Sequence, residues 1–126
     1  MPAVVGTDRD RAVSLRVSGQ PSLRLTGTQA ALVGRVSGAD VWVLGRRTGE
    51  RTFEVERFEV RSVDGVAVRD GVLGVDGSRY HIVLADGTRQ PVVNPPGALR
   101  QHVGDRVWVS GSSTRPVVTF GVIEDR

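Results

Sequence analysis

One segment of this chain occurs twice. Residues 38–48 read GADVWVLGRRT and residues 104–114 read GDRVWVSGSST, so both fit the pattern G-x-x-V-W-V-x-G-x-x-T. Weaker matches continue on both sides at an offset of about 67 residues. An internal repeat constrains architecture more strongly than any single motif does. The sequence therefore predicts a fold built from two similar units.

Val-rich alternation dominates the sequence between turn signals. Val107 and Val109 alternate with Arg106 and Trp108, and the same period of two recurs in other short runs. This period, with β-branched residues, is typical of half-buried strands. Asp-Gly pairs, which favour tight hairpin turns, occur at residues 64–65, 70–71, 76–77 and 86–87. We therefore expect an all-β chain of short strands.

The strand that follows the first V-W-V segment contains a change of phase. Phe53 and Val55 alternate, and so do Phe58 and Val60, but the two pairs differ in phase by one residue. A β-bulge near Glu56 would return both pairs to one face of the sheet. Such a bulge also bends a strand, as the corners of small barrels require.

Two short helical turns are expected, one before each V-W-V strand. Residues 28–35 begin with a capping Thr, and residues 95–102 begin with prolines that suit a first helical turn. The repeats then cover residues 11–59 and 78–126. Residues 60–77 form a connector that could itself be a hairpin, and residues 1–10 are expected to be a disordered lead-in.

A repeat of about 50 residues is of marginal size for independent folding. The chain has no cysteine, so no disulfide can stabilise so small a unit. We therefore expect residues 11–126 to form a single small β-barrel, closed or partly open, whose two pseudo-symmetric repeats share one core. Two separate tandem barrels are the alternative.

The charge of the chain gives little direct indication of a partner. The sequence holds 17 basic and 14 acidic residues, and every basic residue is Arg. Scattered Arg residues without Lys are most simply explained by a GC-rich coding genome, although guanidinium groups also recognise phosphate. A polyanion or a protein remains open as the partner, and the oligomeric state is undetermined.

The sequence lacks an apolar run long enough for a transmembrane helix. Its first residues lack the basic and apolar regions of a secretory signal. As written the chain is expected in the cytoplasm, and a cell-envelope location requires that a signal peptide has been removed. Without cysteine there is no thiolate metal site and no Cys nucleophile.

The two tryptophans are the best candidates for ligand binding. If the valines of each V-W-V strand face the core, Trp42 and Trp108 point away from it. They could then form a stacking platform, with Arg106, Arg46 and Arg47 holding phosphates or other acidic groups. The alternative is structural, because large aromatic side chains are mostly buried and these two rings could cover the junction between the repeats.

Other polar groups indicate no catalytic chemistry. The alternating charges of residues 50–61 are typical of solvated cross-strand pairs. His81 and His102 are the only histidines, and they stand in no metal-binding spacing. No Ser lies in a G-x-S-x-G elbow. We therefore assign no catalytic residue, no metal ligand and no cofactor.

Residues 98–111 read ALRQHVGDRVWVSG, and this helix-then-strand step resembles that of small OB-like β-barrels. The whole chain is also similar to uncharacterised bacterial envelope proteins with duplicated β units. The first resemblance implies a barrel of the kind that often binds oligonucleotides or oligosaccharides. The chain differs from nucleic-acid-binding members in its few aromatic residues, at 5%, and its lack of Lys.

These observations favour a non-catalytic structural or ligand-binding β-barrel module whose ligand is unknown. The alternative is binding of single-stranded nucleic acid or another polyanion through Trp and Arg side chains on an OB-like face. An enzyme is not expected, because no arrangement of acid, base and nucleophile stands out.

Overall fold

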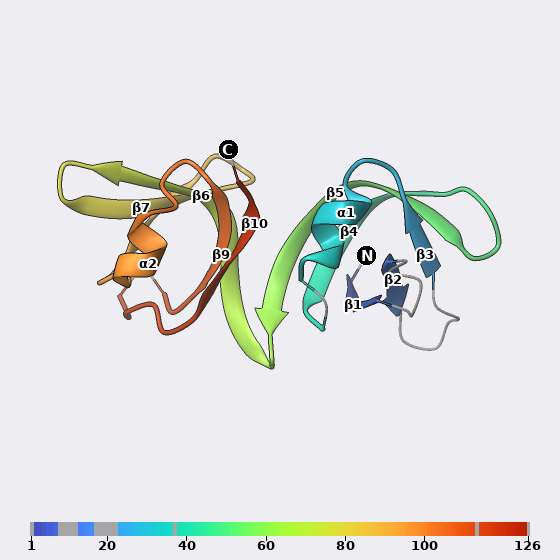
Figure 1. Cartoon of the computed structure of the whole chain (residues 1–126), viewed down its shortest axis with the longest axis horizontal. Coiled ribbons are helices and arrows are strands. Elements are labelled where there is room, and N and C mark those ends of the chain that lie inside the picture. Colours follow the sequence, from blue (N-terminus) through green and yellow to red (C-terminus); the bar gives the residue numbers. More distant parts are fainter. Residues whose placement is uncertain (1, 8–12, 17–22, 37, 113, 126) are drawn as a thin grey trace. The chain divides into compact units, whose positions relative to one another are not determined.

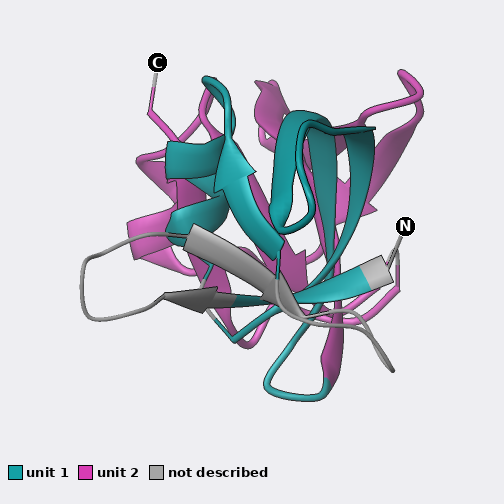
Figure 2. Ribbon diagram, turned by 90° about the vertical axis from the view of Figure 1, so that its right-hand side faces the viewer, with its two compact units in different colours: residues 1–65 teal, residues 66–126 magenta. Residues whose placement is uncertain are grey.

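The computed structural model describes residues 2–7, 13–16, 23–36, 38–112 and 114–125. The chain divides into two compact units, unit 1 with residues 1–65 and unit 2 with residues 66–126, which Figure 2 colours separately. Strands predominate in both, and each described unit contains one short helix (Figure 1). The prediction of a mostly β chain with short helical turns is confirmed.

Unit 1 is a curled sheet with one helix. Its elements are β1 (Pro2–Thr7), β2 (Val13–Arg16), β3 (Leu23–Thr26), α1 (Ala30–Gly34), β4 (Asp40–Arg47) and β5 (Thr52–Val63). β1 pairs antiparallel with β2 and β4, and β2 pairs antiparallel with β3. β5 pairs antiparallel with β4 and parallel with β3. The pairings therefore run in a ring from β1 through β2, β3, β5 and β4 back to β1.

Unit 2 has the same order of elements. They are β6 (Val66–Asp76), β7 (Arg79–Leu84), β8 (Arg89–Val92), α2 (Gly97–Arg100), β9 (Arg106–Ser110) and β10 (Phe120–Glu124). β6 pairs with β7 and β9, β7 with β8, and β9 with β10, all antiparallel. Val93, just after β8, and Pro116, before β10, form a single parallel bridge. This bridge stands where β3 pairs with β5 in unit 1.

The expected disordered lead-in is wrong for residues 2–7, which form β1. Ala3 and Val5 are buried, and Val5 exchanges two backbone hydrogen bonds with the loop before β4, at 2.8 and 3.0 Å. The strand was missed because it precedes the recognisable repeat. Residues 8–10 of the lead-in lie outside the described residues.

Most of the predicted connector is the central strand of unit 2. β5 runs to Val63, the chain turns at Asp64 and Gly65, and β6 begins at Val66. β6 then receives both β7 and β9 as partners. Its Leu73 exchanges two backbone hydrogen bonds with the loop before β9, at 2.7 and 3.1 Å, as Val5 does in unit 1. Unit 2 therefore begins before the repeat predicted for residues 78–126.

Three of the four Asp-Gly pairs lie at turns, where Gly65, Gly77 and Gly87 have positive φ angles. The pair at residues 70–71 does not, and that turn prediction is wrong. Gly71 lies inside β6, where a Cβ atom would collide with the backbone carbonyl oxygen of Val83 on β7. Here glycine is explained by close approach of two strands rather than by a turn.

The predicted β-bulge is confirmed in β5. Leu44 pairs with Arg57 and Gly45 pairs with Val55, so Glu56 has no partner of its own in the register. Glu56 and Arg57 are both exposed. The buried side chains on the two sides of the bulge are Phe53, Val55, Phe58 and Val60. The extra residue therefore returns both apolar pairs to the core face.

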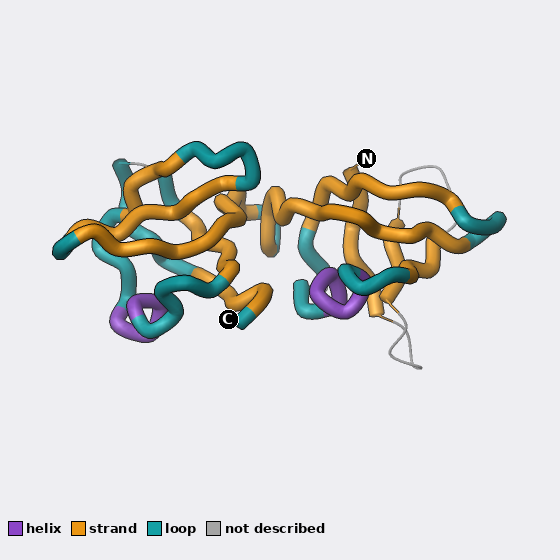
Figure 3. The backbone as a smooth tube through the Cα atoms, turned by 90° about the horizontal axis from the view of Figure 1, so that it is seen from above, coloured by secondary structure: helices purple, strands orange, loops and turns teal. Residues whose placement is uncertain are grey.

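The two helices lie against the sheets (Figure 3). Val33 of α1 and Leu99 of α2 are fully buried. The core of unit 2 consists of Leu73, Ile82, Val92, Leu99, Val107, Val109 and Val117, with Tyr80, Leu84, Phe120 and Val122 packed against it. In the described part of the chain, neither helix has the length or apolar character needed to cross a lipid bilayer.

Candidate functional site

A groove in unit 2 lies where β7 and β8 meet the segment that leads into α2. Its volume is about 640 Å³, within the range of small-molecule pockets. Its lining residues are Ser78, Arg79, Tyr80, Pro91, Val92, Asn94, Pro95 and Arg100. The charged groups in this lining are guanidiniums, and it includes no carboxylate. The groove therefore offers hydrogen-bond donors beside a small apolar surface.

Arg100 is held in place by two contacts. Its Nε donates a hydrogen bond of 3.0 Å to the backbone carbonyl of Pro95, which fixes the side chain against the loop that precedes α2. Its guanidinium carbon lies 5.7 Å from the centre of the Tyr80 ring, a distance at which a cation is attracted to an aromatic face. Arg100 is also one of the residues that line the groove.

Arg79 supplies the second positive charge of the groove. It is exposed at the start of β7, opposite Asp76 in the β6–β7 register. Within the ranges that the structure describes, neither Arg79 nor Arg100 takes part in an ion pair. Both guanidiniums therefore have N–H groups that could donate hydrogen bonds to a bound anion.

The loop between β8 and α2 shapes one wall of the groove. Asn94 has a φ of 43°, in the left-handed region that Asn tolerates better than most residues. Pro95 and Pro96 follow, and they limit the conformations of the chain before the helix. The wall is thus formed by residues whose backbone is locally constrained.

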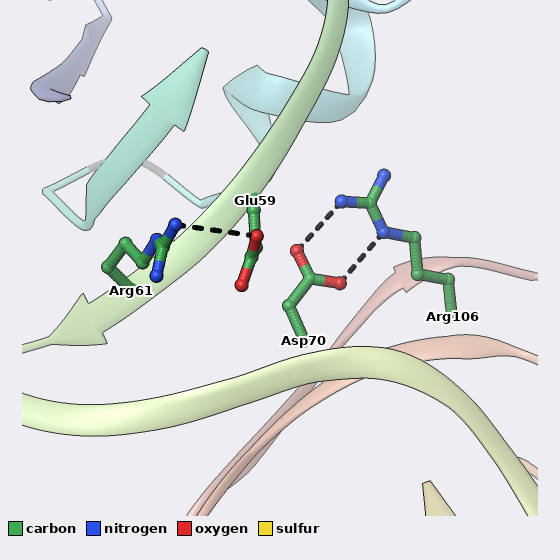
Figure 4. A network of polar contacts seen from close by, with 4 residues as sticks. All are labelled: Glu59, Arg61, Asp70 and Arg106. Atoms are coloured by element: carbon green, nitrogen blue, oxygen red, sulfur yellow. Dashed lines mark hydrogen bonds and ion pairs between the residues drawn. The ribbon is translucent and has the colours of Figure 1, made fainter. Parts of the chain in front are cut away.

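Arg106, one of the predicted ligand-binding residues, is held by a carboxylate. Its Nε donates to Oδ1 of Asp70 at 2.9 Å, and one terminal nitrogen donates to Oδ2 at 2.7 Å. The side chains are 19% and 2% exposed, respectively. Figure 4 shows the two groups facing each other, and it also draws the ion pair between Glu59 and Arg61. The Arg106 guanidinium is therefore engaged within unit 2, with a partner that sequence reasoning missed.

Trp108 lies half-buried on the face opposite the core. Val107 and Val109 on either side of it are fully buried, as expected from the alternation. A methyl group added at Gly121 on β10 would lie 2.6 Å from Cε2 and 2.8 Å from Cζ2 of the indole. The ring therefore covers the glycine of the neighbouring strand, its direct partner in the register.

The other predicted binding residues belong to unit 1. Trp42 is half-buried, and in the register it stands opposite Glu59 of β5. Arg46 is exposed and forms a cross-strand ion pair of 3.7 Å with Glu54. Arg47 is exposed at the end of β4. Within unit 1 the three predicted residues therefore lie along a single strand.

A cluster of His102, Asp105 and Asp125 lies in unit 2. Their potential ligand atoms lie within 4.8 Å of one another. Nδ1 of His102 is 2.9 Å from Oδ2 of Asp105, so a hydrogen bond that braces the turn before β9 accounts for these two side chains. His81 instead lies over Gly74, its register partner on β6.

Sequence reasoning did not single out the groove. Its residues come from a hairpin turn, two strands, a loop and a helix, and no local spacing joins them. The available signals were the paired prolines at residues 95–96 and the aromatic Tyr80. Comparison of the chain with protein-family models, curated proteins and solved structures finds no match.

Proposed function

We propose that this protein is a non-catalytic ligand-binding module made of two related OB-like β-barrel units, with its ligand site in the groove of unit 2. The observation that carries the proposal is the pair of guanidiniums, Arg79 and Arg100, which line one groove without an ion-pair partner among the described residues.

The order of elements supports the OB-like and duplicated architecture. Each unit has three strands, a short helix and two further strands. In unit 1 the pairings run in a ring that includes a parallel contact between the third and fifth strands. The sequence repeat falls on β4 and β9, the fourth strand of each unit. A common ancestral unit explains these coincidences.

The position of the groove supports a binding role. OB-folds often bind ligands on the face of their second and third strands and on neighbouring loops. In unit 2 the second and third strands are β7 and β8, and both line the groove. Fold alone does not establish function. The chemistry of the groove side chains therefore supports a binding role more strongly than the position of β7 and β8 does.

The chemistry of the groove favours binding over catalysis. Arg side chains stay protonated at physiological pH, and Asn and Ser offer hydrogen bonds. These groups can hold and orient a ligand, whereas general acid–base catalysis needs a group that titrates near the working pH. We therefore place no catalytic step in this groove.

The proposal is tested by mapping amide chemical shifts on the full-length, ¹⁵N-labelled chain. Small polyols, carboxylates and phosphates are added one at a time. We expect shifts to concentrate at Tyr80, Asn94 and Arg100. If no added compound moves these amides, or if shifts spread evenly over the surface, the groove is not the ligand site.

A second candidate function is binding of single-stranded nucleic acid or another polyanion through Trp42, Trp108, Arg46 and Arg47, whereas the predicted partner residue Arg106 is held by Asp70. The favouring observation is that both indoles are only half-buried. Fluorescence anisotropy with a labelled oligothymidylate tests it, because binding through phosphates falls steeply with added salt. Trp108→Ala should then weaken binding. Absent binding, or binding that salt does not alter, rejects this candidate.

A further inference from the structure

The groove of unit 2 has the chemistry of a site for anionic sugars. We infer that it binds a small sugar bearing a carboxylate or a phosphate. The inference rests on the proposed function and names the ligand class of the same groove. It follows from the charge of the groove, the fixed position of one guanidinium, and the size and polarity of the remaining lining.

Charge is the first argument. Arg79 and Arg100 line the groove without a carboxylate in the lining. Asp76, the register partner of Arg79, forms no ion pair with it in the described part of the chain. Hydrogen bonds from Arg to a carboxylate or phosphate are stronger than those between neutral groups, and the planar fork suits both anions. The groove therefore favours an anion over a neutral or cationic ligand.

Preorganisation is the second argument. The hydrogen bond from Nε of Arg100 to Pro95 and the contact with the Tyr80 ring fix the guanidinium before any ligand arrives. A long side chain that is already ordered loses less conformational entropy on binding. Both arginines are exposed, but Arg100 has these two contacts and is thus the anchor of the anion, and Arg79 is a second, more adaptable donor.

Size and polarity are the third argument. A volume of about 640 Å³ suits a molecule larger than a bare inorganic ion. Ser78 and Asn94 can hydrogen-bond to hydroxyl groups, and the exposed Pro91 offers apolar contact to a carbon skeleton. A hydroxylated ring with one anionic substituent matches this combination. Carboxylate and phosphate share the required chemistry, and the experiment below separates them.

Calorimetric titration of the full-length chain tests the inference at about 0.15 M salt, where exposed charges are partly screened. The probes are glucuronate, glucose 6-phosphate, glucose and inorganic phosphate. We expect at least one of the two anionic sugars to bind about tenfold or more tightly than glucose and inorganic phosphate. The preferred sugar then identifies the anion.

Three variants assign the binding to the groove. Arg100→Gln and Arg79→Gln should each weaken binding of the preferred sugar about tenfold. Arg89→Gln is the matched control, because Arg89 is an exposed residue of β8 outside the groove lining and should leave the affinity unchanged. Thermal melting of each variant separates loss of binding from loss of folding. If Arg100→Gln unfolds the protein, Arg100→Lys keeps the charge without the fork and should still weaken binding.

The outcomes distinguish this inference from the proposed function. If glucose binds as tightly as the anionic sugars and shifts the groove amides, the anion preference is wrong and the ligand-binding role stands. If inorganic phosphate binds as tightly as the sugars, or if Arg89→Gln weakens binding as much as Arg100→Gln, the sugar site is overturned. If no probe binds and no groove amide shifts, the inference and the proposed function fail together.

Discussion

The buried ion pair of unit 2 gives the sharpest test of how the predicted binding residues are used. Asp70→Asn removes the negative charge from a carboxylate that is only 2% exposed and leaves the Arg106 guanidinium facing an amide. Breaking one side of a buried ion pair costs about 3–5 kcal/mol. Because Arg106 keeps 19% of its side chain exposed, water can partly solvate it, so we expect the lower end, about 3 kcal/mol.

Urea denaturation followed by tryptophan fluorescence and circular dichroism measures this loss. The matched control is Glu54→Gln, which breaks the exposed pair with Arg46. That change should alter the free energy of unfolding by less than about 1 kcal/mol, since surface pairs contribute little. A double variant, Asp70→Leu with Arg106→Met, should be less destabilised than the sum of its single changes, because neither partner is left charged and buried.

The reasoning is refuted if Asp70→Asn shifts the unfolding midpoint no more than Glu54→Gln does, at equal slopes. Arg106 would then be no more constrained than a surface residue. Arg106 would then again be a candidate for ligand binding, as the sequence indicated. A large loss of stability instead assigns Arg106 to the architecture of unit 2.

Three further predictions follow from single contacts. Gly121→Ala should cost about 1–3 kcal/mol in thermal melting because its methyl group meets the indole, and a Trp108→Leu background should reduce this cost. Deleting Glu56 should lower the free energy of unfolding in urea by about 3–6 kcal/mol, because Phe58 and Val60 beyond the bulge then leave the core face. The control Glu56→Gln should change little, and equal unfolding midpoints for the two variants would contradict the role of the bulge. Hydrogen bonds from Thr88 lower the pKa of Asp86, so its carboxylate stabilises the fold above about pH 4, and this contribution disappears as the pH falls further. Asp86→Asn should therefore flatten the acid side of a curve of stability against pH. An unchanged curve would show that the turn contributes nothing.

The groove shows why the candidate site could not be predicted from the sequence. Arg100 and Tyr80 are twenty positions apart in the numbering, and only the tertiary fold, which puts Leu99 of α2 in the core cluster of unit 2, brings the cation over the ring. Arg106 shows the same difficulty from the other side. The spacing of Arg106 and Trp108 indicated that both side chains share one face of their strand. The pairing of β6 with β9 then brings up Asp70, whose carboxylate binds the Arg106 guanidinium.

The sequence by itself determined the local features of this protein. The alternation of Val107 and Val109 set which face of a strand is buried, and the phase change near Glu56 located a bulge, because side-chain direction along a strand depends only on neighbours in the chain. These features follow from a period of two residues. They needed no knowledge of which strands pair.

Only the tertiary structure decided how the strands are used. It placed residues 2–7 and 66–76 in the two curled sheets, explained Gly71 by the approach of a second strand, and paired Arg106 with Asp70. Each of these depends on a partner distant in sequence. The physical reason is that strand pairing is fixed by the burial and hydrogen bonding of the whole sheet, which a local pattern does not specify.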